Sequence, residues 1–148
     1  MTAKIRLTCT DCGQVNQFPA DKAGAHPKCA VCGHALNDGK VAALDLRTLE
    51  KAAKSDDLPL LVDFWAPWCG PCRAMAPEFE KAARALSPRV RLAKIDTQSN
   101  PDATVRFNIR GIPAFILFAR GREVARLSGA RPAADLMRFV EDKLALVG

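Results

Sequence analysis

The chain has 148 residues, of which 49% are hydrophobic and 26% charged, and its formal net charge is +6. This composition is that of a globular protein rather than a disordered one, and no apolar run approaches the roughly 18 residues of a membrane helix. The basic excess is spread along the chain without a block of like charges, which indicates a solvated surface and disfavours a nucleic-acid partner.

The N-terminus, MTAKIRLTCTDC, contains no apolar segment of signal-peptide length. We therefore expect a cytoplasmic protein in a reducing compartment. Six cysteines in such a chain point to metal or redox chemistry rather than to structural disulfides.

The composition changes near residue 40. Residues 1–40 contain four of the six cysteines, both histidines and several turn formers, but no long apolar period. They are typical of a small loop-rich module that cannot hold itself together by core burial. We predict two domains, a four-cysteine module at 1–40 and a larger domain at 41–148.

The four N-terminal cysteines form two Cys-x-x-Cys pairs separated by 16 residues, namely Cys9, Cys12, Cys29 and Cys32. This spacing is typical of a tetrahedral zinc site, and Gly13 and Gly33 allow the tight turn that a zinc knuckle needs. We predict one structural Zn²⁺ on four thiolates. Two disulfides, or His26 or His34 in place of a cysteine ligand, are the alternatives.

From residue 41 onward, short apolar runs alternate with helical patterns. We predict strands at 41–44, 60–65, 90–95, 114–118 and 123–127, and helices at 46–53, 71–86, 100–107 and from Pro132 onward. The run at 60–65 is apolar around one aspartate, as in a central strand covered on both faces. The alternation predicts an α/β fold with parallel strands, and the turn at Arg120-Gly121 adds an antiparallel hairpin.

A third cysteine pair, Cys69-Gly70-Pro71-Cys72, follows the predicted central strand and opens a helix. Cysteines at i and i+3 in a first helical turn lie close enough to form a disulfide. The helix N-terminus favours the thiolate of Cys69, and the deeper Cys72 can attack a mixed disulfide on Cys69. A second metal half-site is the alternative, but the strand–turn–helix context favours redox chemistry.

Asp63 interrupts the apolar central strand, where an acid is costly unless it is paired or functional. Desolvation should raise the pKa of Asp63 and let it exchange protons near neutral pH. A structural acid satisfied by backbone donors is the alternative.

The segment LVDFWAPWCGPC resembles the active-site segment of thioredoxins almost letter for letter. The resemblance covers roughly residues 41–148, and the N-terminal cysteine pairs narrow it to the second, zinc-binding type of bacterial thioredoxin. It implies the thioredoxin fold, a mixed central sheet flanked by helices, with a small zinc-ribbon-like module in front.

The resemblance also implies roles for the residues of the dithiol site. Cys69 would be the nucleophile and Cys72 the resolving thiol, with Gly70 and Pro71 tuning their redox properties. Asp63 would accept the proton of Cys72. Lys94 is similar to the lysine that lies near this aspartate in the family and would tune it, although it could equally be a solvated charge at a strand end.

Substrate contacts follow from the same resemblance. Gly111-Ile112-Pro113 looks like the family's cis-proline loop, and Gly129 falls where thioredoxins place a substrate-facing glycine loop. With Trp68, which lies outside the strand and should be exposed, they would form a shallow apolar surface. An extended substrate segment would pair with the Ile112 backbone there as an added strand.

These expectations describe a monomeric protein-disulfide reductase that thioredoxin reductase re-reduces with NADPH, and that binds no organic cofactor itself. One alternative is a zinc-ribbon module that binds a protein or nucleic acid on a thioredoxin scaffold. The intact WCGPC argues against it, since a scaffold needs no dithiol. A second alternative is an oxidase or disulfide isomerase, which the reducing compartment and the Gly-Pro pair disfavour.

Overall fold

A five-stranded mixed sheet forms the centre of the structure, a computed structural model that describes residues 3–147. Its strand order is β3 (Ala42–Leu44), β5 (Arg91–Asp96), β4 (Leu60–Trp65), β6 (Ala114–Ala119) and β7 (Arg122–Ser128). The first three strands run parallel, and β6 and β7 are antiparallel to their neighbours. The predicted α/β class with a mixed sheet is confirmed.

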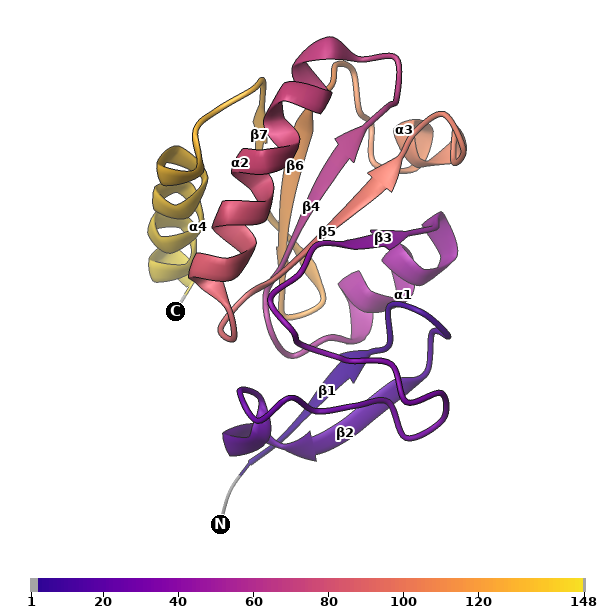
Figure 1. The fold of residues 1–148 in the computed structure, drawn as a ribbon, viewed down its shortest axis with the longest axis vertical. Helices are drawn as coiled ribbons and strands as arrows, with labels where there is room; N and C mark the ends of the chain where they lie inside the picture. Colours follow the sequence, from indigo (N-terminus) through magenta and orange to yellow (C-terminus); the bar gives the residue numbers. More distant parts are fainter. Residues whose placement is uncertain (1–2, 148) are drawn as a thin grey trace.

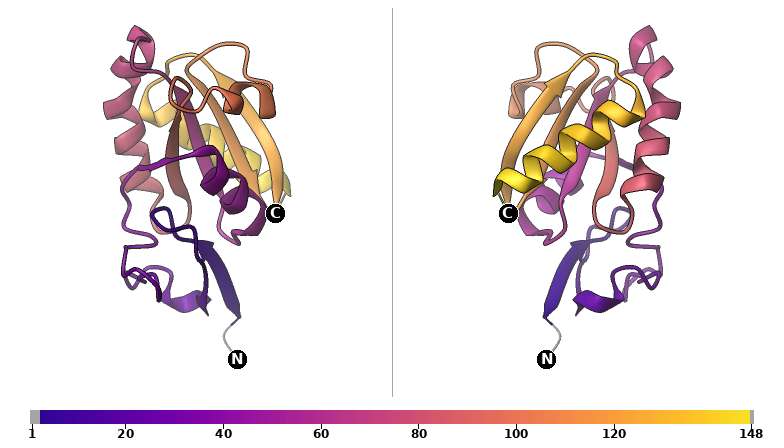
Figure 2. Two further views of the ribbon diagram at one scale, coloured as in Figure 1. Left: turned by 90° about the vertical axis from the view of Figure 1, so that its right-hand side faces the viewer. Right: turned by 90° about the vertical axis from the view of Figure 1, so that its left-hand side faces the viewer.

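Helices cover both faces of this sheet (Figures 1 and 2). One face carries α1 (Leu46–Ser55) and α3 (Asp102–Arg106), and the other carries α2 (Gly70–Leu86) and α4 (Ala133–Val147), which pack side by side. Each face has its own buried apolar cluster. The central strand β4 is therefore covered on both sides, as its apolar sequence predicts.

The predicted elements of residues 41–148 all exist, with shifts of one or two residues at most ends. Two differences have a simple cause. The last helix begins at Ala133 instead of Pro132, whose carbonyl accepts from the amides of the first turn. The first strand begins at Ala42 instead of Val41, because its pairing with β5 starts there. Pro77 lies inside an unbroken α2.

The N-terminal module has more structure than predicted. Two strands, β1 (Lys4–Thr8) and β2 (Val15–Pro19), form an antiparallel hairpin, followed by the short 3₁₀ helix η1 (Ala20–Lys22). A small buried cluster of its own contains Leu7, Cys9, Cys29 and Leu36. The prediction of a loop-rich module did not include this hairpin, whose five-residue strands carry too few apolar residues to show a clear period.

Buried polar groups join this module to the sheet, at the end opposite the β4–α2 turn (Figure 1). Arg91 at the start of β5 forms an ion pair with Asp56, and both side chains are almost fully buried. The Arg91 guanidinium also donates to the carbonyls of Thr8, at 3.1 Å, and Leu36, at 2.8 Å. Asp56 in turn accepts from the Thr8 amide at 2.7 Å. The Arg91–Asp56 ion pair thus anchors two segments of the module. Thr8 lies just before the first cysteine pair, and Leu36 follows the second.

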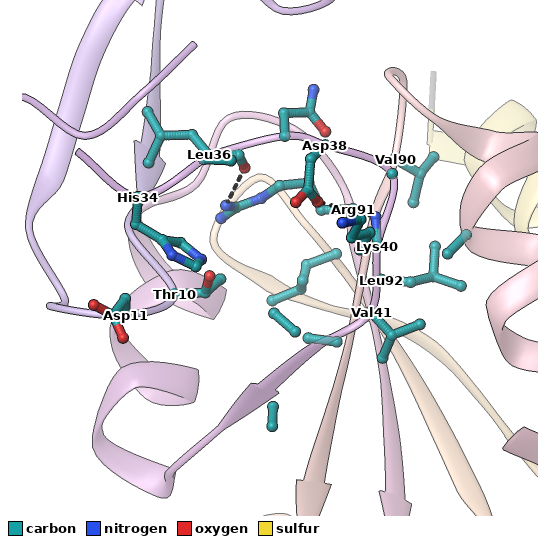
Figure 3. A pocket seen from close by; sticks show the side chains of 18 residues that line it. Thr10, Asp11, His34, Leu36, Asp38, Lys40, Val41, Val90, Arg91 and Leu92 are labelled. Carbon is teal, nitrogen blue, oxygen red and sulfur yellow. Dashed lines mark hydrogen bonds between the residues drawn. The ribbon is translucent and has the colours of Figure 1, made fainter. Parts of the chain in front are cut away.

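Beside this ion pair lies a cavity of about 310 Å³, drawn in Figure 3. His34, Thr10 and Asp38 line it from the module, and Val41, Arg91 and Leu92 from the domain. The module and the domain therefore meet across a partly open junction rather than through a continuous apolar interface.

Among residues 3–147, no helix has both the length and the apolar character required to cross a membrane.

Candidate functional site

Cys69 and Cys72 form a disulfide at the N-terminus of α2, with their Cα atoms 5.2 Å apart. Cys69 is the residue that caps the helix, and its sulfur accepts from the Cys72 amide at 3.2 Å. Pro71, which has no amide hydrogen, occupies the first turn at no hydrogen-bond cost. The free amide and the helix dipole both favour negative charge on the Cys69 sulfur when the disulfide is reduced.

The loop before β6 and the loop after β7 meet each other, and the first of them reaches this dithiol. The Ile112–Pro113 peptide is cis, and the Ile112 carbonyl oxygen lies 3.9 Å from the Cys69 sulfur. The Gly129 amide donates to the Pro113 carbonyl at 2.9 Å, in a conformation with φ of +92° that favours glycine. The structure thus brings Ile112 to the dithiol, with Pro113 next to it in the chain, and this hydrogen bond joins Gly129 to Pro113.

A shallow hollow of about 500 Å³ lies in front of Cys69. Trp68 forms part of it and is 70% exposed, as its place in the turn predicts. The remaining lining comes from the first turn of α2, from the loop that leads to Pro113, and from Thr97 and Thr104, and Arg110 is its one charged residue among those described. An apolar surface of this kind beside a reactive sulfur suits an extended peptide.

Asp63 lies in the buried centre of β4 and is only 4% exposed. Its Oδ1 atom is buried without a hydrogen-bond partner among the described residues. Burial raises the pKa of Asp63 to about 7, although the positive charge of Lys94 acts in the opposite direction. Asp63 can therefore take up and release a proton at neutral pH.

Lys94 stands directly opposite Asp63 in the register of β4 and β5. Its ammonium group lies 4.9 Å from the centre of the Trp65 ring, within the range of a cation–π contact. Trp65 thus touches the lysine that acts on Asp63.

A second cavity, of about 530 Å³, lies behind the dithiol. Asp63 and Cys72 line its buried part, together with Lys94 and Trp65. The structure therefore brings the predicted proton acceptor and the predicted resolving thiol to one cavity, even though they come from β4 and α2.

The four cysteines of the N-terminal module form a separate cluster, with all four sulfurs within 4.8 Å of one another. Cys9 and Cys32 have sulfurs 3.6 Å apart, and so do Cys12 and Cys29. Zn–S bonds of about 2.3 Å in a tetrahedron place sulfurs about 3.8 Å apart, so the cluster fits a zinc ion. Neither histidine belongs to this cluster.

The two cysteine pairs of this cluster have the same local geometry. Gly13 and Gly33 have φ values of +82° and +79°, and their amides donate to the carbonyls of Cys9 and Cys29. Amides also point at the sulfurs, from Asp11 and Cys12 to Cys9 and from Val31 to Cys29. Such donors stabilise thiolates, which are the form that binds a metal.

Sequence reasoning missed the residues that join these two sites to the rest of the fold. Arg91 and Asp56 show nothing unusual in the sequence except a charge next to an apolar run. Their partnership depends on tertiary structure, because they lie 35 residues apart. The connection at 39–41, which lines the cavity behind the dithiol, carried no signal either.

A dithiol at a helix N-terminus, beside a buried acid and a peptide-sized apolar surface, defines a thiol–disulfide oxidoreductase. Comparison with known proteins agrees. Residues 40–142 match the profile of the family described as Thioredoxin, and residues 8–34 match that described as Thioredoxin 2, N-terminal, a zinc ribbon.

The chain is 39% identical to Thioredoxin C-3 of Corynebacterium nephridii over 138 residues, which cover 93% of this chain and 94% of that one. It is 38% identical to part of a bifunctional thioredoxin reductase/thioredoxin of Mycobacterium leprae, covering 73% of this chain and 24% of that protein. The crystal structure of chloroplastic thioredoxin z is similar with a TM-score of 0.66 and 37% identity, covering 72% of this chain and 96% of that one. The chain belongs to the thioredoxin family, to the type that carries an N-terminal zinc ribbon.

Proposed function

We propose that this chain is a protein-disulfide reductase that works through Cys69 and Cys72. The observation that carries the proposal is the placement of Cys69. Its sulfur caps α2 and lies 3.9 Å from the Ile112 carbonyl, at the edge of the apolar hollow that contains the exposed Trp68. A substrate strand paired with Ile112 would bring its own disulfide to this sulfur.

The reaction proceeds in two exchanges. The Cys69 thiolate attacks one sulfur of the substrate disulfide, and the other substrate sulfur leaves as a thiolate that takes a proton from water. Cys72, as a thiolate, then attacks the Cys69 sulfur, which releases the second substrate sulfur as a thiolate that takes a proton from water, and leaves the Cys69–Cys72 disulfide. Two electrons have passed from the dithiol to the substrate.

The second exchange needs the Cys72 thiol to lose its proton inside the fold. Asp63 is the buried acid that shares a cavity with Cys72, and its raised pKa of about 7 makes it a suitable acceptor at neutral pH. Lys94 opposes that rise in pKa. We assign Asp63 as the proton acceptor and Lys94 as the residue that tunes it, with Gly70 and Pro71 shaping the turn between the two sulfurs.

Substrate contacts are assigned to Trp68, Ile112, Pro113 and Gly129. Their support is their common place around Cys69, and the hydrogen bond from the Gly129 amide to the Pro113 carbonyl that holds the two loops together. We expect the surface to accept many sequences, because backbone pairing and apolar contact select little by side chain.

Electrons would come from NADPH through thioredoxin reductase. The relative from Mycobacterium leprae, in which a thioredoxin reductase and a thioredoxin are one bifunctional protein, supports this partner. We infer a cytoplasmic monomer with two domains, residues 1–40 and 41–148, and no bound organic cofactor.

In the N-terminal domain, Cys9, Cys12, Cys29 and Cys32 would hold one Zn²⁺. Four thiolates fill a tetrahedral ion, so the metal would have a structural role, and an oxidant that attacks a ligand could release it. The support is the cluster of sulfurs and the amides directed at them.

The test is NADPH consumption by thioredoxin reductase in the presence of insulin, with wild type compared with Cys69→Ser. We expect turnover from the wild type alone. Dithiothreitol in place of reductase and NADPH separates the two parts of the proposal. If the wild type reduces insulin with dithiothreitol but not with the reductase, only the electron donor is wrong. If it fails with both, the reductase function is wrong.

Cys72→Ser is the matched variant, because it keeps Cys69 and removes only the second exchange. It should accumulate a stable mixed disulfide with insulin that a mass spectrum identifies through Cys69. A mixed disulfide on any other cysteine would contradict the assignment of the nucleophile.

A further inference from the structure

The short connection between the zinc ribbon and the thioredoxin domain lies at the dithiol site. Gly39, Lys40 and Val41 line the cavity of about 530 Å³ that also contains Asp63 and Cys72. The cavity extends from exposed residues at its rim to these two buried groups. Solvent that reaches Asp63 through this cavity therefore passes Gly39 and Lys40, which precede the predicted thioredoxin domain, and Val41, which is the first residue of that domain.

The charged and titratable groups around Asp63 come from three elements. The connection contributes Lys40, β5 contributes Lys94, and α2 contributes Cys72, Arg73, Glu80 and Arg84. On its other side β4 pairs with β6, where the residue opposite Asp63 is Phe115, which does not titrate. Cations thus predominate at this cavity, and one of them belongs to the connection.

Polar contacts with the ribbon and the domain fix Leu36 and Asn37, which lead into the connection. Arg91 holds the Leu36 carbonyl at 2.8 Å. The Asn37 side chain donates both to Ala23 in the ribbon and to Pro88 in the domain, each at 3.0 Å. Asn37 is itself buried, so these bonds are protected from water. The folded ribbon thereby determines the path of the chain into the cavity.

Packing fixes the connection itself, at both Gly39 and Val41. Gly39 has a φ of +78°, and a Cβ atom there would lie 3.3 Å from Ser87, so the chain passes close to the C-terminal end of α2. Val41 is half-buried and packs against the apolar cluster shared by α2 and α4. Its side chain fills space that water would otherwise occupy in the cavity that Asp63 also lines.

We propose that the connection Gly39–Val41 is a positioning element of the dithiol site, which limits the access of water to Asp63, and that the ribbon serves the reaction by holding this connection in place. The claim about water access stands on the cavity alone. Its consequence for catalysis rests on the proposed role of Asp63 as proton acceptor.

The physical link is desolvation. Burial is the main cause of the raised pKa of Asp63, so a residue that keeps water from this carboxyl contributes to that rise. Removing part of Val41 opens the cavity, stabilises the carboxylate and lowers the pKa. A negative charge at position 40 does the opposite, because it disfavours a second anion in the same cavity.

The first experiment compares Val41→Ala with Val124→Ala in the full zinc-loaded chain. Val124 is the matched control, because it is also half-buried against the same apolar cluster but lies on β7, away from the cavity. The measurement is the pKa of Asp63 in the oxidised protein, from the pH dependence of its carboxyl carbon resonance. We expect Val41→Ala to lower this pKa by about half a unit or more and Val124→Ala to leave it unchanged.

The second pair is Lys40→Glu and Lys22→Glu. Both replace an exposed lysine and change the net charge equally, but Lys22 lies in η1, outside the cavity. We expect Lys40→Glu to raise the pKa of Asp63, at low salt more than at high salt, and Lys22→Glu to leave it unchanged. The two cavity variants thus shift the pKa in opposite directions, which general loosening of the fold would not produce.

An unchanged pKa in both cavity variants, or equal shifts in the control variants, would overturn the proposal. Insulin reduction as a function of pH then tests the consequence. In Val41→Ala, the midpoint of the pH–activity profile should shift by the same amount as the measured pKa of Asp63. In a chain that already carries Asp63→Asn, adding Val41→Ala should leave the profile unchanged. If the pKa moves but the activity profile does not, the role of Asp63 in the proposed function is wrong and the role of the connection stands.

Discussion

The ribbon and the thioredoxin domain use the same Cys-x-x-Cys spacing for two different arrangements of sulfur. In the ribbon, each pair is followed by a glycine with positive φ, so the chain turns back and four sulfurs meet within 4.8 Å. In the domain, the pair lies at the start of α2, where Cys69 caps the helix and Cys72 is in its first turn, so only two sulfurs meet and they bond to each other.

The difference teaches that the backbone after the second cysteine decides the chemistry of the pair. Gly13 and Gly33 permit a turn that directs amides at the sulfurs from one side and leaves the other side for a metal. Pro71 and the residues after Cys72 continue as a helix. The Cys72 amide in its first turn favours the thiolate of Cys69, and the helix provides no second cysteine pair that could complete a metal site.

The largest effects are expected when one sulfur is removed from each arrangement, Cys29 from the ribbon and Cys72 from the domain. Cys29→Ser should reduce the zinc content from about one equivalent to a small fraction, because three thiolates leave the tetrahedron incomplete. Without the metal, the β1–β2 hairpin should lose its protection from amide hydrogen exchange. Strands β4 to β6 should keep theirs, since they have their own core.

Cys72→Ser is the control for this variant and should show the reverse pattern. It should retain zinc and hairpin protection while losing insulin turnover. If zinc binding survives in Cys29→Ser, or if Cys72→Ser loses zinc, the division of the six cysteines into four and two is wrong.

The next effect concerns the ion pair that joins the two regions. Arg91→Met leaves the Asp56 carboxylate buried without its partner, which should lower the free energy of unfolding by about 3 to 5 kcal/mol. Arg89→Met is the matched control. That arginine is exposed and lies 3.7 Å from Glu141, so its loss should cost about 1 kcal/mol or less. Urea unfolding at pH 7 measures both.

The double variant Arg91→Met with Asp56→Asn sharpens the interpretation. Because it removes the unpaired charge, it should lose less stability than the sum of the losses in Arg91→Met and Asp56→Asn measured singly, and that difference is the coupling energy of the pair. A double variant as unstable as the sum of the single variants would mean that Arg91 acts through its bonds to Thr8 and Leu36 rather than through Asp56.

The sequence predicts most of the thioredoxin domain because its signals are local. The apolar run at 60–65 and the cysteine pair before a helical period identify β4, α2 and the dithiol without knowledge of any distant contact. Asp63 could be singled out for the same reason, since a charge inside a buried strand is conspicuous.

The parts that sequence reasoning missed depend on contacts between distant residues. Arg91 begins a strand, where an arginine usually lies in solvent, and only the folded chain shows that Asp56 and the Thr8 carbonyl surround it. The β1–β2 hairpin was missed because its strands are short and half-exposed. Lys40 showed no signal, because its place at the cavity follows from how the ribbon docks.

The smallest effect in free energy is expected from Asp63→Asn, and it depends on pH. The pKa of Asp63 rises from 3.8 to about 7 on folding, so between these values the folded state holds a proton that the unfolded state has released. Stability contributed by this carboxyl is therefore lost as the pH rises from about 4 to 7. Asp63→Asn removes that loss and should stabilise the protein by about 3 to 4 kcal/mol above pH 7, and by little below pH 4.

Urea unfolding of Asp63→Asn at pH 4, 6 and 8 measures this difference, with Asp142→Asn, at an exposed position of α4, as the control variant. A stability gain that is equal at all three values would mean that the asparagine improves packing and that the carboxyl of Asp63 does not titrate in this range. A gain that grows with pH, together with slower insulin reduction, would show an acid that costs stability and is retained for its proton. In the ribbon, function would not lower stability in this way, because zinc binding by the four sulfurs would itself stabilise the fold.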